Sequence, residues 1–66
     1  MNELMICFGN AGWAYHQTDC ETLFEAVIEF FNCMMGMNIN VDNLHYTEAV
    51  LRDENGDDIE QEYRTK

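Results

Sequence analysis

The alternation of apolar and polar positions predicts a β-hairpin at the start of the chain. Leu4, Ile6 and Phe8 alternate along a run of strand length. Residues 9–12 (GNAG) follow as a turn signal, because glycine accepts positive φ and asparagine tolerates it. The run WAYHQ then returns to strand-like composition. We therefore expect a hairpin over residues 3–17.

Residues 18–36 have the pattern of an amphipathic helix. The sequence TDCE at 18–21 matches a capping box, in which Thr18 caps the helix and the glutamate three positions on reaches back. Gly36 is a plausible residue to end it. Three of the four acidic residues of the segment fall on one narrow stripe: Glu21, Glu25 and Glu29. The rest is largely apolar, an arc wider than one small sheet covers.

The C-terminal part predicts a second hairpin over residues 45–63. Asn55-Gly56 is the strongest short hairpin signal available. Beyond it, alternation places Asp58, Glu60 and Glu62 on one face of a strand. Residues 37–44 alternate weakly and fit either a short strand or an extended loop. The sequence thus predicts a single domain over residues 1–66, an α+β fold in which one helix packs on a small antiparallel sheet in the order β-β-α-β-β.

Charge is the most unusual property of the chain. Thirteen acidic residues face three basic ones, for a formal net charge of −10, and residues 1–51 contain no lysine or arginine. Six of the acids lie in the stretch DENGDDIEQEY at 53–63. An ordinary surface mixes both signs, so this one-signed composition is a candidate functional feature.

Metal sites and catalysis are not predicted. Starting at Asp53, the calcium-loop pattern fails, because its sixth position is Asp58 instead of glycine and its twelfth is Arg64. The possible zinc ligands lack the close spacing of a zinc knuckle: Cys7, His16, Cys20, Cys33 and His45. Cys20 is the one plausible nucleophile, but the acids beside it oppose a thiolate. We expect no enzyme, no metal and no cofactor, and the three cysteines to be free thiols.

Direct binding to nucleic acid or to an acidic membrane is excluded by the scarcity of basic residues, because both depend on lysine and arginine. The chain shows no signal peptide and no apolar stretch of membrane-spanning length, so we expect a cytoplasmic protein.

Rows of carboxylates suggest the opposite role, a stand-in for nucleic acid. Acids four residues apart on a helix recur every 6 Å or so, and alternate acids on a strand every 6.6 Å or so. Duplex DNA presents one charge per roughly 3.4 Å of each strand. A basic cleft that holds DNA or RNA would attract such rows. The predicted partner is therefore a basic nucleic-acid-binding protein or complex, and the predicted contact residues are Glu21, Glu25, Glu29, Glu48, Asp53, Glu54, Asp57, Asp58, Glu60 and Glu62.

In size, charge and element order, with TDCETLFEAVIEFF as its helix, the chain resembles the small acidic inhibitors carried by bacteriophages, including anti-CRISPR proteins and other nucleic-acid mimics. The resemblance is to a class and rests on no shared motif. It implies a stoichiometric blocker of a host defence or nucleic-acid-processing enzyme, acting in the bacterial cytoplasm, and it assigns no site residue.

A different class of function is also open, a small structural or regulatory subunit that pairs with a copy of itself or with another protein. The wide apolar arc of the helix supports it, since large exposed apolar patches mark interfaces and methionines adapt to irregular ones. The interface residues that this hypothesis predicts are Phe30, Met34 and Met37.

Overall fold

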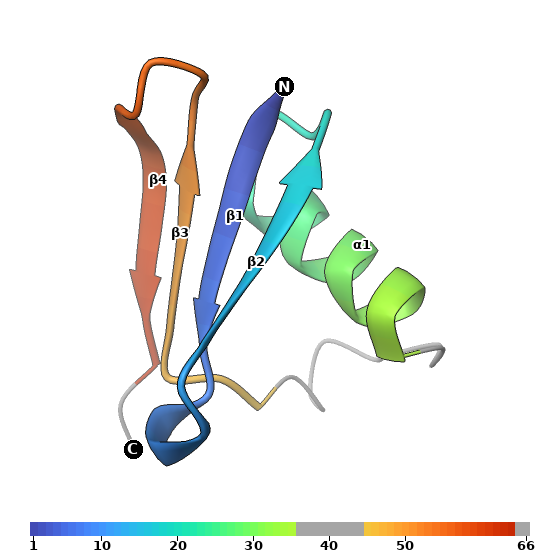
Figure 1. Cartoon of the computed structure of the whole chain (residues 1–66), viewed down its shortest axis with the longest axis vertical. Coiled ribbons are helices and arrows are strands. Elements are labelled where there is room, and N and C mark those ends of the chain that lie inside the picture. Colours follow the sequence, from blue (N-terminus) through green and yellow to red (C-terminus); the bar gives the residue numbers. More distant parts are fainter. Residues whose placement is uncertain (36–44, 65–66) are drawn as a thin grey trace.

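In the part of the chain that the structure describes, a four-stranded antiparallel sheet is covered on one face by one α-helix (Figure 1). The computed structural model describes residues 1–35 and 45–64. Its elements are β1 (Asn2–Cys7), the short 3-10 helix η1 (Gly9–Ala11), β2 (Trp13–Thr18), α1 (Leu23–Met35), β3 (Glu48–Arg52) and β4 (Asp58–Tyr63). The predicted α+β class is confirmed, while η1 was not predicted. Residues 37–44, for which strand and loop were both open, lie outside the described part.

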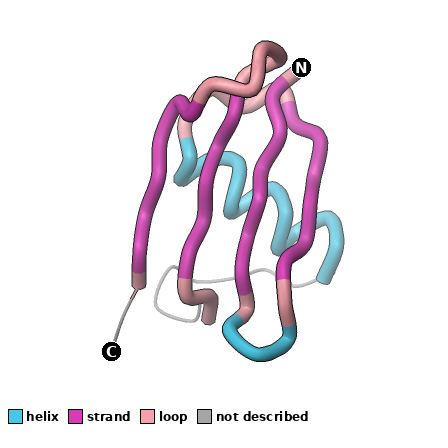
Figure 2. The backbone as a smooth tube through the Cα atoms, turned by 60° about the vertical axis from the view of Figure 1, so that its left-hand side comes forward, coloured by secondary structure: helices cyan, strands magenta, loops and turns pink. Residues whose placement is uncertain are grey.

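The two hairpins join through their first strands, so that the sheet order is β2-β1-β3-β4 (Figure 2). Every neighbouring pair is antiparallel, with Met5 of β1 opposite Tyr15 of β2 and Val50 of β3. The register of β3 with β4 shifts once, between Leu51 and Arg52. The two central strands therefore come from opposite ends of the sequence, and β2 and β4 form the two edges.

The helix begins four residues later than the sequence predicts, with Thr22 in place of Thr18 as its cap. Thr18 still belongs to β2, where it lies opposite Asn2 and is only 2% exposed. A second capping box, TLFE, is used instead. The N–H of Glu25 donates to the Thr22 hydroxyl at 3.3 Å, and that hydroxyl donates to the Glu25 carboxylate at 2.8 Å. The sequence contains two Thr-x-x-Glu patterns four residues apart, and strand pairing takes the first.

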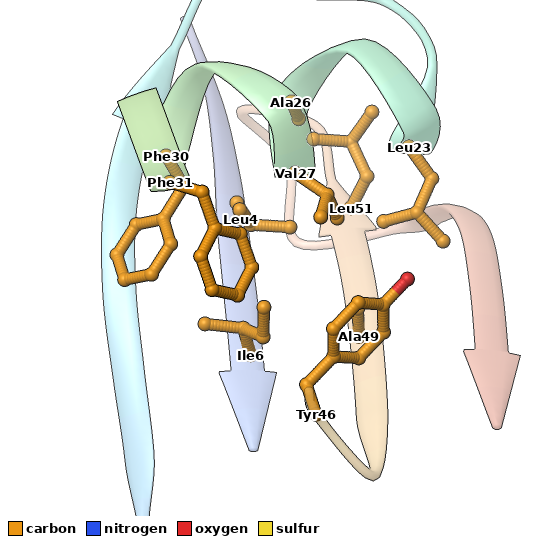
Figure 3. Close-up of a cluster of buried hydrophobic side chains, with 10 residues drawn as sticks. All are labelled: Leu4, Ile6, Leu23, Ala26, Val27, Phe30, Phe31, Tyr46, Ala49 and Leu51. Carbon is orange, nitrogen blue, oxygen red and sulfur yellow. The ribbon is translucent and has the colours of Figure 1, made fainter. Parts of the chain in front are cut away.

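The core lies between the helix and the sheet (Figure 3). The Phe30 and Phe31 rings meet edge to face at 5.5 Å between centroids, and Phe31 also stacks near Tyr46 at 6.4 Å. Each such buried side chain contributes about 1.5–3 kcal/mol to folding. The core residues are Leu4, Ile6, Leu23, Ala26, Val27, Phe30, Phe31, Tyr46, Ala49 and Leu51.

The burial of Phe30 corrects one prediction. Only 4% of this residue is exposed, so it stabilises the core and is not available to an oligomer interface on the helix surface. Most of the wide apolar arc of the helix instead packs against the sheet and against neighbouring aromatic rings. Among the α1 residues whose side chains the structure describes, Phe24 is the exposed large apolar one, at 57%. Met37 and the side chain of Met34 lie outside the described part.

Candidate functional site

Carboxylate groups gather at one end of the sheet. Here β1 and β4 begin while β2 and β3 finish, as the pairs Asn2–Thr18 and Arg52–Asp58 show. The β2–α1 connection and the start of α1 lie at the same end (Figure 1). Nine of the thirteen acids lie in these segments, so the negative charge is concentrated and not spread evenly. We call them the acidic end: Glu3, Asp19, Glu21, Glu25, Asp53, Glu54, Asp57, Asp58 and Glu60.

Few positive charges offset the acidic end. Within the described residues, Arg52 is the one lysine or arginine there, and its Nε lies 2.9 Å from Oδ1 of Asp58. The amino group of Met1 contacts Glu54 and holds the pKa of that carboxyl below its usual value. A shallow hollow of about 450 Å³ opens between these groups, lined by Met1, Glu3, Gln17, Arg52, Asp53, Glu54 and Gly56. The end as a whole keeps a strong excess of negative charge.

The β3–β4 turn explains the densest run of acids. The Asp53 carboxylate accepts the N–H groups of Asn55 and Asp57 at 2.9 and 3.0 Å. The N–H of Gly56 donates to the Asp53 carbonyl at 3.1 Å, and Gly56 has φ +85°. This is a three-residue hairpin loop with its glycine in the left-handed region. Asp53 therefore serves the turn, while the side chains of Glu54 and Asp57 are exposed.

Two acids of β4, Glu60 and Glu62, share one face, as predicted, but that face is turned toward the helix. Asp58 lies beyond the register shift and pairs with Arg52 on the opposite face. Glu60 and Glu62 lie opposite Leu51 and Ala49, two core residues. An Oε1 atom of Glu60 accepts the N–H of Leu23, the first residue of α1, at 2.9 Å. The expectation of a free row of phosphate-like charges along β4 is thus wrong, because Asp58, Glu60 and Glu62 each have a partner within the fold.

Glu62 belongs to a second local network, away from the acidic end. The Tyr46 hydroxyl donates to its Oε1, and the Arg64 Nε lies 3.2 Å from the same atom. The Arg64 guanidinium also sits 4.7 Å from the centre of the Tyr46 ring. Burial, followed by the hydrogen bond to Glu62, raises the pKa of Tyr46 to about 12. These contacts fix the start of β3 against the end of β4.

The three acids of the predicted helix stripe also have different surroundings in the structure. Glu21 precedes the helix and is exposed, and Glu25 closes the capping box. Glu29 turns toward the sheet, where it lies 2.9 Å from Nε2 of His16 and accepts the Cys20 thiol at 3.5 Å. Hydrogen bonds from Thr18 and His16 hold the pKa of Glu29 below its usual value. The three glutamates do not form one continuous row.

The grouping of His16, Cys20 and Glu29 was not predicted from the sequence. It joins β2, the β2–α1 connection and α1, and its central member is the carboxylate. The Glu29 carboxylate that accepts the Cys20 thiol has a lowered pKa, so it is a weak base for activating a cysteine nucleophile. The described residues contain no group of three or more histidine, cysteine or acidic side chains arranged to hold a metal ion. All three cysteines are free.

Glu48, like Glu62, lies away from the acidic end. It starts β3 at the opposite end of the sheet, between Cys7 and Tyr63, where its carboxylate accepts the Gln61 amide at 3.0 Å. It shares the uncovered face of the sheet with several exposed apolar side chains, a feature that the sequence reading missed. They come from both edge strands: Trp13 and Tyr15 of β2 and Tyr63 of β4.

Comparison with known proteins gives no relative. No protein-family model, curated protein or solved structure matches the chain. The described part of the chain contains no helix of the length and apolarity needed to cross a bilayer. The acidic end and the uncovered face of the sheet are the two surfaces of the described structure with an unusual composition.

Proposed function

We propose that this protein is a small acidic inhibitor that binds the nucleic-acid-binding surface of a basic enzyme or complex, of the host-defence type represented by CRISPR–Cas. The observation that carries the proposal is the convergence of nine acids, from four separate segments, on one end of the molecule. A groove lined with lysine and arginine attracts such a surface strongly and steers its approach.

The contact residues in this proposal are the acids that have no structural task. Asp19, Glu21 and Asp57 are exposed, and none of their carboxylates has a hydrogen bond within the described residues. Glu60, Asp53 and Glu25 instead hold the helix start and the turn in place. The proposed mimic is thus a compact anionic end supported by a framework of structural carboxylates, and not a straight ladder of charges.

In the proposed mode of action, the protein occupies the nucleic-acid-binding groove of its target and catalyses no reaction. One molecule would block one groove, and the effect would depend on the ratio of inhibitor to target. In this proposal the protein acts in the bacterial cytoplasm, where its free thiols stay reduced. The competing hypothesis, a subunit that binds through the apolar face of its helix, loses its central residue because Phe30 is in the core.

A displacement experiment tests the proposal. The protein is immobilised, exposed to bacterial lysate at low salt, and washed with either double-stranded DNA, single-stranded RNA or an uncharged dextran. Release of the captured protein by one nucleic acid and not by dextran is expected, because the two would compete for the same groove. Retention of every captured protein in the presence of saturating nucleic acid would contradict the proposal.

A further inference from the structure

The outer edge of β2 carries backbone groups that no strand of the described chain pairs with. β2 lies at one edge of the sheet and pairs with β1 alone. In an antiparallel pair, residues that bond to the neighbour alternate with residues that face away. The N–H of Phe8 donates to the Gly12 carbonyl at 2.9 Å, which sets the phase of that alternation. The residues whose N–H and C=O groups point outward are Trp13, Tyr15 and Gln17.

The other edge of the sheet is protected and β2 is not. Natural proteins guard edge strands with charged side chains, prolines or bulges. β4 carries Asp58, Glu60 and Glu62 along its length. β2, with the sequence WAYHQT, is the one strand of the four described that has no acidic residue, lysine or arginine. Its register with β1 is uninterrupted over all six residues.

The net charge of −10 restricts how two copies of this chain can meet. They repel each other wherever acids face acids, so contact is favourable only through a segment without them. β2 is such a segment. An antiparallel arrangement of two β2 strands also directs the two acidic ends away from each other, toward opposite ends of the pair.

We propose that a second copy of this chain docks on β2, through antiparallel pairing of the two β2 strands into one continuous eight-stranded sheet. The central register places Tyr15 opposite Tyr15 of the second copy, and Trp13 opposite its Gln17. This register satisfies the outward backbone groups of both strands. It also covers two exposed aromatic side chains of each copy, since Trp13 is 43% and Tyr15 60% exposed.

The pairing involves one short strand from each copy, which makes the interface smaller than the roughly 1,200 Å² typical of stable complexes. The dimer is therefore reversible and concentration-dependent. Salt strengthens it, because screening reduces the repulsion between two anionic molecules. Capture of a basic partner by the acidic end has the opposite salt dependence, so the failure of one proposal is distinguishable from the failure of the other.

Sedimentation equilibrium over a wide concentration range tests the proposal. The mass is expected to rise from 7.7 kDa toward twice that value, at lower concentration in high salt than in low salt. Tyr15→Glu places like charges directly opposite each other, which weakens association at least about tenfold. Tyr63→Glu is the matched control, on the same face of the other edge and 65% exposed, and leaves association within about twofold of the parent chain.

Hydrogen exchange tests the backbone pairing directly in the unaltered chain, so that the answer does not depend on how well the variants fold. The amides of Trp13, Tyr15 and Gln17 are expected to gain protection as concentration rises. On the other edge, the bond from the Arg64 N–H to the Thr47 carbonyl sets the phase, and the outward amides of Gln61 and Tyr63 are expected to gain no protection as concentration rises. A monomer at all concentrations, an equal effect of both variants, or equal protection of both edges would overturn the proposal.

Discussion

The Glu60 carboxylate of β4 accepts the backbone N–H of Leu23, the first residue of α1, at 2.9 Å. The first turn of a helix has N–H groups without intrahelical partners and carries partial positive charge. A glutamate of the edge strand thus completes the helix start from outside the helix. This contact links the second hairpin to the helix, and it converts one of the proposed mimic charges into a structural group.

Replacing Glu60 by alanine is expected to destabilise the fold by about 1 kcal/mol, the usual cost of losing an N-terminal helix cap. Glu60→Gln keeps an acceptor and loses the charge, so it should fall between the parent and the alanine variant. Urea denaturation followed by circular dichroism measures both. Asp57→Ala, which removes a charge from the same end without touching the helix, should change stability by less than about 0.5 kcal/mol. Equal effects at both positions would contradict the capping role.

Tyr46 gives the fold a characteristic response to alkaline pH. Its pKa is raised to about 12 in the folded chain, by burial and by the bond to Glu62, and its usual value is 10.0. Because the folded state binds the phenolic proton more tightly, the stabilisation is complete below pH 10 and is lost as the pH rises toward 12. Denaturation at a series of pH values should show this loss, and ultraviolet absorbance should show late ionisation of one tyrosine. In Tyr46→Phe the loss attributable to this group should disappear.

Phe30 and Phe24 are a buried and an exposed phenylalanine of the same helix, so their substitution compares the two environments. Phe30→Ala should cost about 3–5 kcal/mol, because it opens a cavity between helix and sheet. That is a large part of the stability expected of a chain this small, about 3–10 kcal/mol. Phe24→Ala should change stability by less than about 0.5 kcal/mol, since the side chain is 57% exposed. Thermal denaturation of the two variants distinguishes them, and similar losses would contradict the assignment of Phe30 to the core.

The strands were predictable from the sequence because alternation and turn residues act locally. GNAG and Asn55-Gly56 both lie in hairpin connections, and the strands that flank them occupy nearly the expected residues. The helix start was not predictable in the same way. Thr18 and Thr22 offer equivalent local caps, and the choice between them depends on the pairing of Thr18 with Asn2, a contact between distant residues.

The acidic surface was predictable in composition and not in geometry. Alternation correctly placed Glu60 and Glu62 on one face of β4, but a period of two cannot say which face meets the helix. Their partners, Leu23 and Tyr46, lie far away in the sequence. Likewise, the convergence of Asp19 and Glu21 with the β3–β4 turn follows from sheet order, which the sequence reading did not address.

Binding of the captured partner to charge-reversed variants tests the central claim most directly. Glu21→Lys combined with Asp57→Lys alters two exposed acids of the acidic end, and Glu48→Lys combined with Glu62→Gln alters the opposite end of the sheet. Affinity is measured by surface plasmon resonance at several salt concentrations, after circular dichroism has shown that both variants fold. We predict that the first pair of changes weakens binding at least about tenfold, with a shallower salt dependence, and that the second changes it little. Equal affinity of both variants and the parent chain for the partner would contradict the claim that the acidic end makes the contact.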